Sequence, residues 1–176
     1  MTLHDALHPA AIGFTVLAVC AHPGWRSREA SIGLVAAILM LAGMIDTAYA
    51  NLLSVVVWIP LLLAAAIGVS AARSVRRPRV RTGAGDGVWV TTHDPLGLVV
   101  TAAILPLMHV GSAPAGTHAG HGAPMGVLIA LVVIIAAWHV VGSFLACVRN
   151  SATAERVQLV AMGISTSFMA LSVAAS

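Results

Sequence analysis

The sequence contains very little charge. Charged residues make up 9% of the 176 residues and hydrophobic residues 59%, whereas soluble domains carry roughly 25% charged residues. So few charges cannot cover a water-facing surface, which excludes an ordinary soluble domain and indicates a protein whose main partner is the lipid bilayer. Lysine is absent, and the arginines are confined to a few short stretches. That distribution is typical of loops between membrane spans and not of a nucleic-acid-binding surface.

Features of secretion, disulfide bonding and catalysis are also scarce. The two cysteines, Cys20 and Cys147, lie within apolar runs, so no disulfide framework is expected. The first basic residue is Arg26, so the N-terminus lacks the positive region of a cleavable signal peptide and is expected to be retained. No Ser-His-Asp arrangement, carboxylate pair, P-loop or zinc-protease pattern is present. We therefore do not expect an enzyme.

Six apolar segments predict transmembrane helices, because a bilayer-spanning helix needs about 20 mostly apolar residues. They cover residues 4–22, 30–48, 52–72, 88–110, 126–148 and 154–174. Small residues are frequent in every segment, which allows membrane helices to approach closely. The predicted fold class is all-α, a single integral membrane bundle of six transmembrane helices.

The arginines predict how this bundle is oriented. Arg26 and Arg28 follow the first span, residues 73–87 form a basic loop after the third, and Arg149 and Arg156 follow the fifth. With six spans these loops share one side, which the positive-inside rule makes cytoplasmic. Both termini are then extracytoplasmic. Arginine without lysine, with abundant alanine, valine and glycine, suggests a GC-rich bacterium and thus a bacterial plasma membrane.

The loop at residues 109–125 is rich in Gly, Pro and Ala and carries no charged residue. Imidazole and thioether groups are ligands of soft metal ions, and thioethers select Cu(I). The lack of carboxylates in the loop argues against calcium or magnesium. The potential ligands in or beside this loop are Met108, His109, His118, His121 and Met125.

Other sulfur and imidazole groups are predicted at the same membrane depth. Met40 and Met44 are spaced i, i+4 and share one helix face, and Met169 lies in the outer part of the last span. His4 and His8 lie near the outer end of the first span. The alternatives are structural: methionines in membrane helices commonly pack, loop histidines can be solvated, and terminal histidines can anchor a helix.

Three further histidines, His22, His93 and His139, are predicted toward the cytoplasmic half. They could form a metal exit site or supply axial haem ligands. A structural role is favoured, because His93 lies in a Thr-Thr-His-Asp-Pro stretch typical of a helix start. His139 beside Trp138 is expected to be a packing residue, and haem is not expected.

Asp46 is interpreted as the only acidic residue within a span, close to the outer interface where burying a carboxylate costs little. It lies two residues after Met44, about 200° round a regular helix. The two side chains are therefore not expected to share a metal unless the helix unwinds. No ion pair within the membrane is expected.

Short motifs give the chain a family resemblance. Residues 39–44 (Leu-Met-Leu-Ala-Gly-Met), residues 107–109 (Leu-Met-His), the His/Gly loop and the Met-Gly and Phe-Met-Ala elements of residues 156–170 carry it. The pattern resembles an actinobacterial family of small polytopic membrane proteins of unknown function, with Met-rich helices and a His/Gly-rich outer loop. Thr166 departs from that pattern, which has a methionine there. The resemblance implies a fold and a type of organism, but no activity.

The leading functional hypothesis is an outward-facing copper site that serves copper binding, delivery or transport. His109, His118 and His121 would capture the ion, and Met40, Met44 and Met169 would hold or relay it. The Met-x-x-x-Met spacing is similar to the selectivity element of eukaryotic-type copper uptake channels, which are three-span trimers. The alternative is a non-catalytic accessory subunit of a larger respiratory or envelope complex, or a homo-oligomer, because a chain of small-residue helices is suited to packing against others.

Overall fold

The computed structural model describes residues 3–25, 31–76, 86–110, 122–149 and 152–174, and these residues form helices and short connections without a strand. The predicted all-α class is confirmed. Two short elements, the 3-10 helix η1 (Pro23–Trp25) and the π-helix η2 (Asp46–Ala50), accompany six longer helices. The latter are α1 (Leu3–Cys20), α2 (Ser31–Ile45), α3 (Val55–Arg76), α4 (Asp86–Val110), α5 (Gly122–Arg149) and α6 (Thr153–Ala174).

Each predicted span coincides with one of these helices, give or take a few residues at the ends. Within the described residues, four stretches are long and apolar enough to cross a membrane: Ser31–Ala50, Val55–Val75, Gly126–Val148 and Thr153–Val173. Two shorter apolar stretches, Ala6–Cys20 and His93–Leu107, belong to α1 and α4. The chain thus has the helices of a multi-pass membrane protein.

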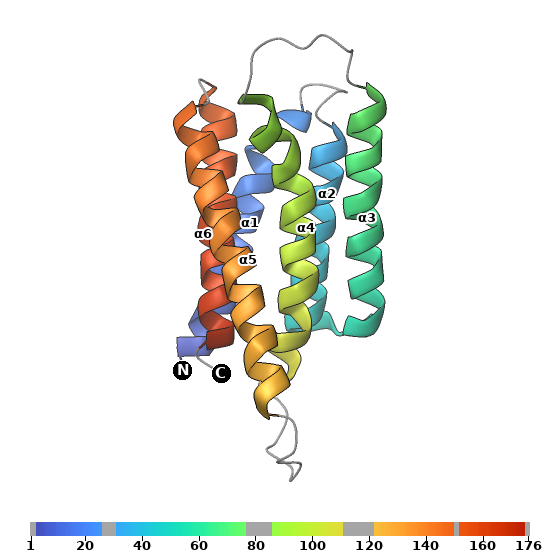
Figure 1. The fold of residues 1–176 in the computed structure, drawn as a ribbon, viewed down its shortest axis with the longest axis vertical. Coiled ribbons are helices and arrows are strands. Elements are labelled where there is room, and N and C mark those ends of the chain that lie inside the picture. The colour runs from blue at the N-terminus through green and yellow to red at the C-terminus, as the bar shows by residue number, and fades with distance from the viewer. Residues whose placement is uncertain (1–2, 26–30, 77–85, 111–121, 150–151, 175–176) are drawn as a thin grey trace.

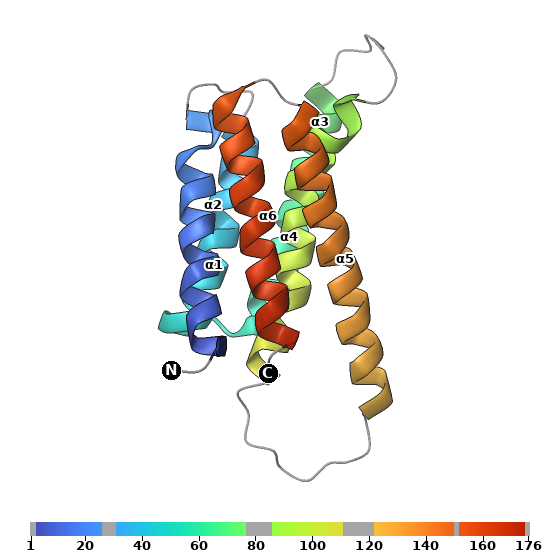
Figure 2. The ribbon, with the colours of Figure 1, turned by 90° about the vertical axis from the view of Figure 1, so that its left-hand side faces the viewer.

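The helices run up and down along one common axis (Figures 1 and 2). The N- and C-termini lie at the same end of the bundle, here called the termini end. α3 ends at Arg76 and α5 at Arg149, both at the opposite end, here called the arginine end. α4 packs against α2, α3, α5 and α6, so it is the central helix.

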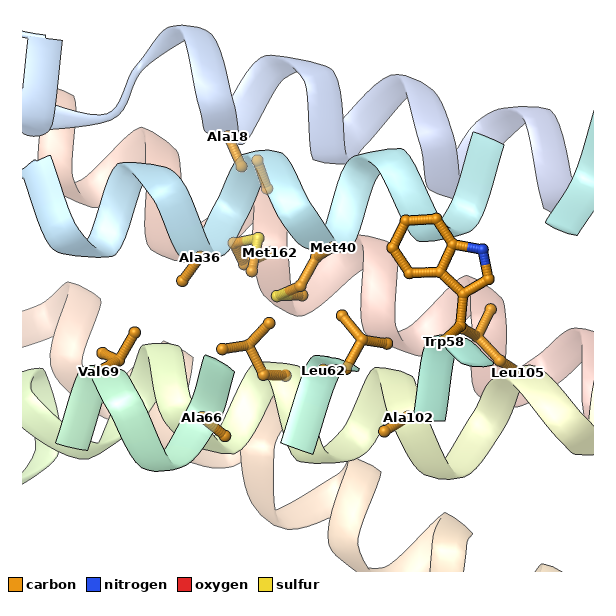
Figure 3. Packing of buried hydrophobic residues seen from close by; sticks show 12 residues of the cluster. Ala18, Ala36, Met40, Trp58, Leu62, Ala66, Val69, Ala102, Leu105 and Met162 are labelled. Carbon is orange, nitrogen blue, oxygen red and sulfur yellow. The ribbon is translucent and has the colours of Figure 1, made fainter. Parts of the chain in front are cut away.

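The apolar side chains of the core fall into two main clusters. The Trp58 cluster consists of Ala18, Ala36, Met40, Trp58, Leu62, Ala66, Val69, Leu98, Ala102, Leu105, Ala161 and Met162 (Figure 3). The Met44 cluster consists of Ala11, Met44, Val100, Ile104, Leu107, Val132, Ala136, Met169 and Val173. Both clusters contain alanines, small residues that let helices approach closely in lipid.

Hydroxyl side chains in these helices are satisfied locally. Thr101 donates to the carbonyl of Gly97 at 2.9 Å and Thr166 to that of Met162 at 3.0 Å. A carbonyl four residues earlier is the nearest acceptor for a helical Ser or Thr, and it removes the cost of placing the hydroxyl in an apolar interior.

Several boundaries differ from those predicted. α3 continues to Arg76, so Arg73 belongs to a helix and not to the basic loop. α4 begins at Asp86, which places His93 two turns inside the helix and corrects the helix-start interpretation. The prediction relied on Pro95, which favours a first turn, but the apolar residues before His93 extend the helix. His109 and Met125, predicted in the loop, lie in α4 and α5.

Candidate functional site

The ten predicted metal ligands fall into three groups. His118 and His121 lie outside the described residues. Four more lie on helices whose backbone alone is described there: His4 on α1, Met108 and His109 on α4, and Met125 on α5. The side chains of His8, Met40, Met44 and Met169 can be placed, and they decide what the predicted site looks like.

Met44 and Met169 come together at the termini end. Both are buried members of the Met44 cluster, although they come from α2 and α6. Met44 is the penultimate residue of α2, and Met169 lies in the last turns of α6. His8 of α1 lines a small cavity together with Met44 and Thr47. One imidazole and one thioether therefore border the same space, and a second thioether belongs to the cluster beside it.

A hydroxyl group of α1 lies beside the Met44 sulfur, and a hydroxyl group of α6 lies beside that hydroxyl. Thr15 Oγ1 lies 3.5 Å from Met44 Sδ and 2.7 Å from Ser165 Oγ. Ser165 also approaches the carbonyl oxygen of Ala11 at 2.8 Å. Thr15 has a single hydroxyl proton, and the oxygen acceptors are closer than the sulfur. The lone pairs of the Met44 thioether are thus not committed to a strong hydrogen bond.

Met40 lies apart from this group. It belongs to the Trp58 cluster, at 2% exposure, together with Met162 of α6. A Cβ placed on Gly97 would lie 3.4 Å from the Met40 Sδ and 3.4 Å from His139 Cε1. The i, i+4 spacing puts Met40 and Met44 on one face of α2. They nevertheless pack in different clusters, Met40 in the Trp58 cluster and Met44 in the Met44 cluster.

Asp46 has a structural role. Its carboxylate accepts hydrogen bonds from the backbone N–H groups of Leu52 and Leu53, at 2.8 and 3.0 Å, and from Trp58 Nε1 at 2.6 Å. α2 does change at this point, into the π-helix η2. The three donors nevertheless occupy the carboxylate, which ties the end of α2 to the start of α3.

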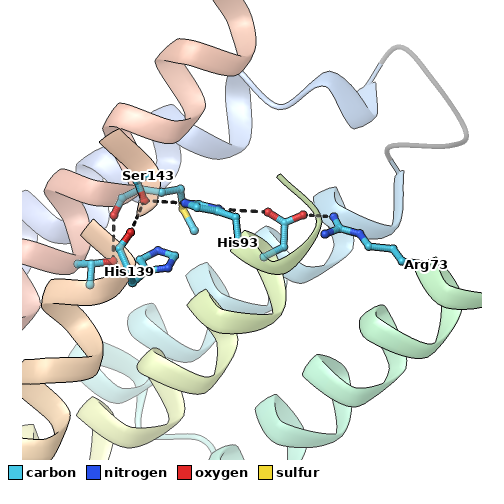
Figure 4. A network of polar contacts seen from close by, with 7 residues as sticks. Arg73, His93, His139 and Ser143 are labelled. Carbon is cyan, nitrogen blue, oxygen red and sulfur yellow. Dashed lines mark hydrogen bonds and ion pairs between the residues drawn. The ribbon is translucent and has the colours of Figure 1, made fainter. Parts of the chain in front are cut away.

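A series of polar contacts, here called the polar chain, runs from α3 through α4 to α5 (Figure 4). Arg73 of α3 forms an ion pair with Asp94 of α4. His93 Nδ1 lies 3.5 Å from the Asp94 carboxylate, and His93 Nε2 is hydrogen-bonded to Ser143 Oγ of α5 at 2.7 Å. Ser143 in turn donates to the carbonyl of His139 at 2.8 Å.

The polar chain corrects two expectations, that Asp46 is the only acidic residue within a span and that no ion pair lies between the helices. Asp46 is not the only acidic residue within a predicted span, because Asp94 lies in the fourth and Asp5 and Glu155 lie near the starts of the first and the last. Arg73 pairs with Asp94, so an ion pair does lie between helices. The signal was present in the sequence: Arg73 directly follows the third apolar segment and Asp94 lies near the start of the fourth, so both lie at the same end of the bundle. The helix-start interpretation of His93-Asp94-Pro95 concealed it.

His22 lies close to the Arg73–Asp94 ion pair, beside Gly33 of α2. A Cβ on Gly33 would lie 2.5 Å from Asp94 Oδ2 and 3.0 Å from both an Arg73 guanidinium nitrogen and His22 Nε2. Burial lowers the pKa of His22 below its usual value, and Arg73 lowers it further, against the opposing charge of Asp94. His22 Nδ1 accepts the N–H of Gly24 at 2.9 Å, so the neutral ring carries its proton on Nε2, the atom nearest Gly33.

His139 is the least satisfied polar group of the core. It is 1% exposed, and neither of its ring nitrogens has a hydrogen-bond partner among the described residues. Its ring packs against that of His93, with centroids 4.5 Å apart and planes inclined at 34°. Buried polar groups normally have partners, so His139 is not a satisfied packing histidine as the sequence suggested.

Within the described part of the chain, no three His, Cys, Asp or Glu side chains are grouped as a metal site. No family model, curated protein or solved structure matches the chain. The resemblance to the actinobacterial family accordingly stays a prediction, and function has to be argued from the side chains themselves.

Proposed function

We propose that the chain is a six-span protein of a bacterial plasma membrane that binds copper at its termini end, for delivery or transport. The observation that carries the proposal is the position of Met44, which shares one buried cluster with Met169 of α6 and lines one small cavity with His8 of α1. Thioether and imidazole groups together favour Cu(I). This end of the bundle is also where α4 ends in Met108 and His109.

The arrangement of arginines supports the orientation that the proposal needs. α3 and α5 both end in arginine at the arginine end, opposite the termini. The positive-inside rule then places the termini end, with Met44 and Met169, on the extracytoplasmic side. Copper arriving from outside would meet the His/Met loop first and the buried thioethers second.

The test is copper binding by the purified full chain in a mild detergent. We expect about one Cu(I) at this end. We expect its affinity to fall at least tenfold in His118→Ala/His121→Ala and in Met44→Leu/Met169→Leu, since each pair removes first-sphere ligands and even weaker outer-shell changes cost about 10–100-fold. His22→Gln is the matched control, because His22 hydrogen-bonds Gly24 at the other end, and it should bind like the wild type.

Two results would contradict the proposal. One is a wild-type protein without copper after loading, and the other is an affinity that neither variant changes. Purification with a stoichiometric partner and without copper would instead favour the accessory-subunit alternative.

A further inference from the structure

The imidazole of His139 is buried and has no hydrogen-bond partner among the described residues. It lies on α5 at 1% exposure, with both ring nitrogens unpartnered among the described residues. The polar chain passes beside it: Ser143 uses only the backbone carbonyl of His139, and His93 only stacks on its ring. An imidazole without a hydrogen bond in an apolar interior is costly to retain, which indicates a binding role.

Two thioethers lie in the same region. His139 Cε1 and Met40 Sδ both approach the backbone of Gly97 on the central helix, each within 3.4 Å of the position of its missing Cβ. Gly97 leaves the space that brings these two side chains to one point. Met162 of α6 belongs to the same buried cluster as Met40, and Figure 3 shows the two side chains in its middle.

We infer that His139, Met40 and Met162 form a second metal site, specific for Cu(I), inside the bundle. One imidazole and two thioethers are soft and neutral ligands, which suit Cu(I) and not hard cations. With neutral ligands a monovalent ion brings one uncompensated charge into the apolar interior, and a divalent ion brings two. The nearby carboxylate of Asp94 is committed to Arg73 and gives no compensation for a divalent ion.

His93 and Ser143 act as positioning residues for this site. The hydrogen bond between His93 Nε2 and Ser143 Oγ fixes the His93 ring, and that ring packs face against His139. On the other side of the ring, His93 Nδ1 lies 3.5 Å from the Asp94 carboxylate without a hydrogen bond, so Ser143 is the residue that fixes the ring. Groups that orient a metal ligand in this way commonly change metal affinity about 10–100-fold when removed.

The inner site extends the proposed function along α2. Met40 and Met44 are one helical turn apart, a rise of about 6 Å, so an ion held at the termini end has its next sulfur ligand on the same helix. The inference rests on the proposed function only for the identity of the metal. The ligands themselves are different residues, so each site can be removed without the other.

The experiment is an anaerobic Cu(I) titration of the purified full chain in detergent, against a chromogenic Cu(I) chelator. The background variant His8→Ala/Met44→Leu/His109→Ala/His118→Ala/His121→Ala/Met169→Leu removes the ligands proposed for the termini end, and we expect it to keep one Cu(I). Adding His139→Leu, or Met40→Leu with Met162→Leu, should abolish that binding. Ser143→Ala should weaken it about tenfold. His22→Gln is the matched control and should leave it unchanged.

A melting curve of each variant separates ligand loss from misfolding. His139→Leu replaces an unsatisfied polar group by an apolar one, so the copper-free variant should melt no lower than the wild type. Cu(I) should raise the melting temperature of the wild type and of the background variant, and not that of His139→Leu. X-ray absorption of the bound copper should show sulfur neighbours that Met40→Leu/Met162→Leu removes.

The outcomes distinguish this inference from the proposed function. A background variant that binds no copper, when the wild type binds one, overturns the inner site and leaves the termini-end site standing. Wild type and background that both bind one ion, lost in His139→Leu, support the inner site and overturn the other. Unchanged binding in His139→Leu overturns the inference in either case.

Discussion

Gly33 is the residue on which the charged end of the polar chain depends. The side chains of Asp94, Arg73 and His22 all approach its backbone. An Asp94 oxygen lies only 2.5 Å from the position that a Cβ on Gly33 would take. The pair is partly buried, and displacing one partner leaves the charge of the other partly uncompensated. The Arg73–Asp94 ion pair between α3 and α4 therefore requires a glycine at position 33 of α2.

We expect Gly33→Ala to destabilise the protein by about 1–3 kcal/mol, the usual cost of overpacking a filled site. Gly13→Ala is the control: Gly13 is also helical, and nothing lies within 4 Å of its Cβ position. Because alanine is the better helix former by about 1 kcal/mol, that change should be neutral or stabilising. Thermal unfolding in detergent measures both, and equal melting temperatures would refute the role of Gly33.

At the scale of elements, the sequence predicted the helices well and their contacts poorly. Length and apolar composition are properties of one segment, so all six helices could be found. Contacts depend on how neighbouring segments rotate, and no local pattern records that. Met40 and Met44 illustrate the limit: their spacing placed them on one face, but Met44 lies beside Thr15 of α1, whereas Met40 lies beside Gly97 of α4.

The connection between α2 and α3 shows the same limit at a turn. The predicted membrane depth of Asp46 suggested no particular role for it. In the structure its carboxylate accepts three hydrogen bonds from the segment that follows. Asn51, the only described non-glycine residue with positive φ, at 48°, closes the π-helix by donating its N–H to the carbonyl of Asp46 at 2.7 Å. Asparagine tolerates this conformation better than most residues.

We expect Asp46→Ala to destabilise the protein by about 2 kcal/mol, because it leaves the buried Trp58 indole N–H without its acceptor and frees two backbone donors. Trp58→Phe removes one of the three bonds and should cost about 1 kcal/mol from that source. The double variant should cost less than the sum, since both changes break the same contact. Unfolding curves that add without coupling would show that the Asp46–Trp58 bond is unimportant.

At the scale of the whole molecule, the position of the proposed copper site depends on orientation. Both termini lie at one end of the bundle, and α3 and α5 end in arginine at the other. An even number of crossings is required for the termini to share a side, and arginine-rich loops are retained in the cytoplasm. If the orientation were reversed, the Met44 and Met169 pair would face the cytoplasm, and copper would meet the arginine end first.

Single cysteines decide this orientation. In a Cys20→Ala/Cys147→Ala background, Thr117→Cys in the His/Met loop should react with a membrane-impermeant maleimide on intact cells. Thr82→Cys in the basic loop should react only after the membrane is permeabilised. The opposite pattern would invert the protein and move the proposed copper site to the cytoplasmic face. Labelling of both positions on intact cells would mean that α4, the helix between Thr82 and Thr117, does not cross the membrane, so the six-span arrangement would be wrong.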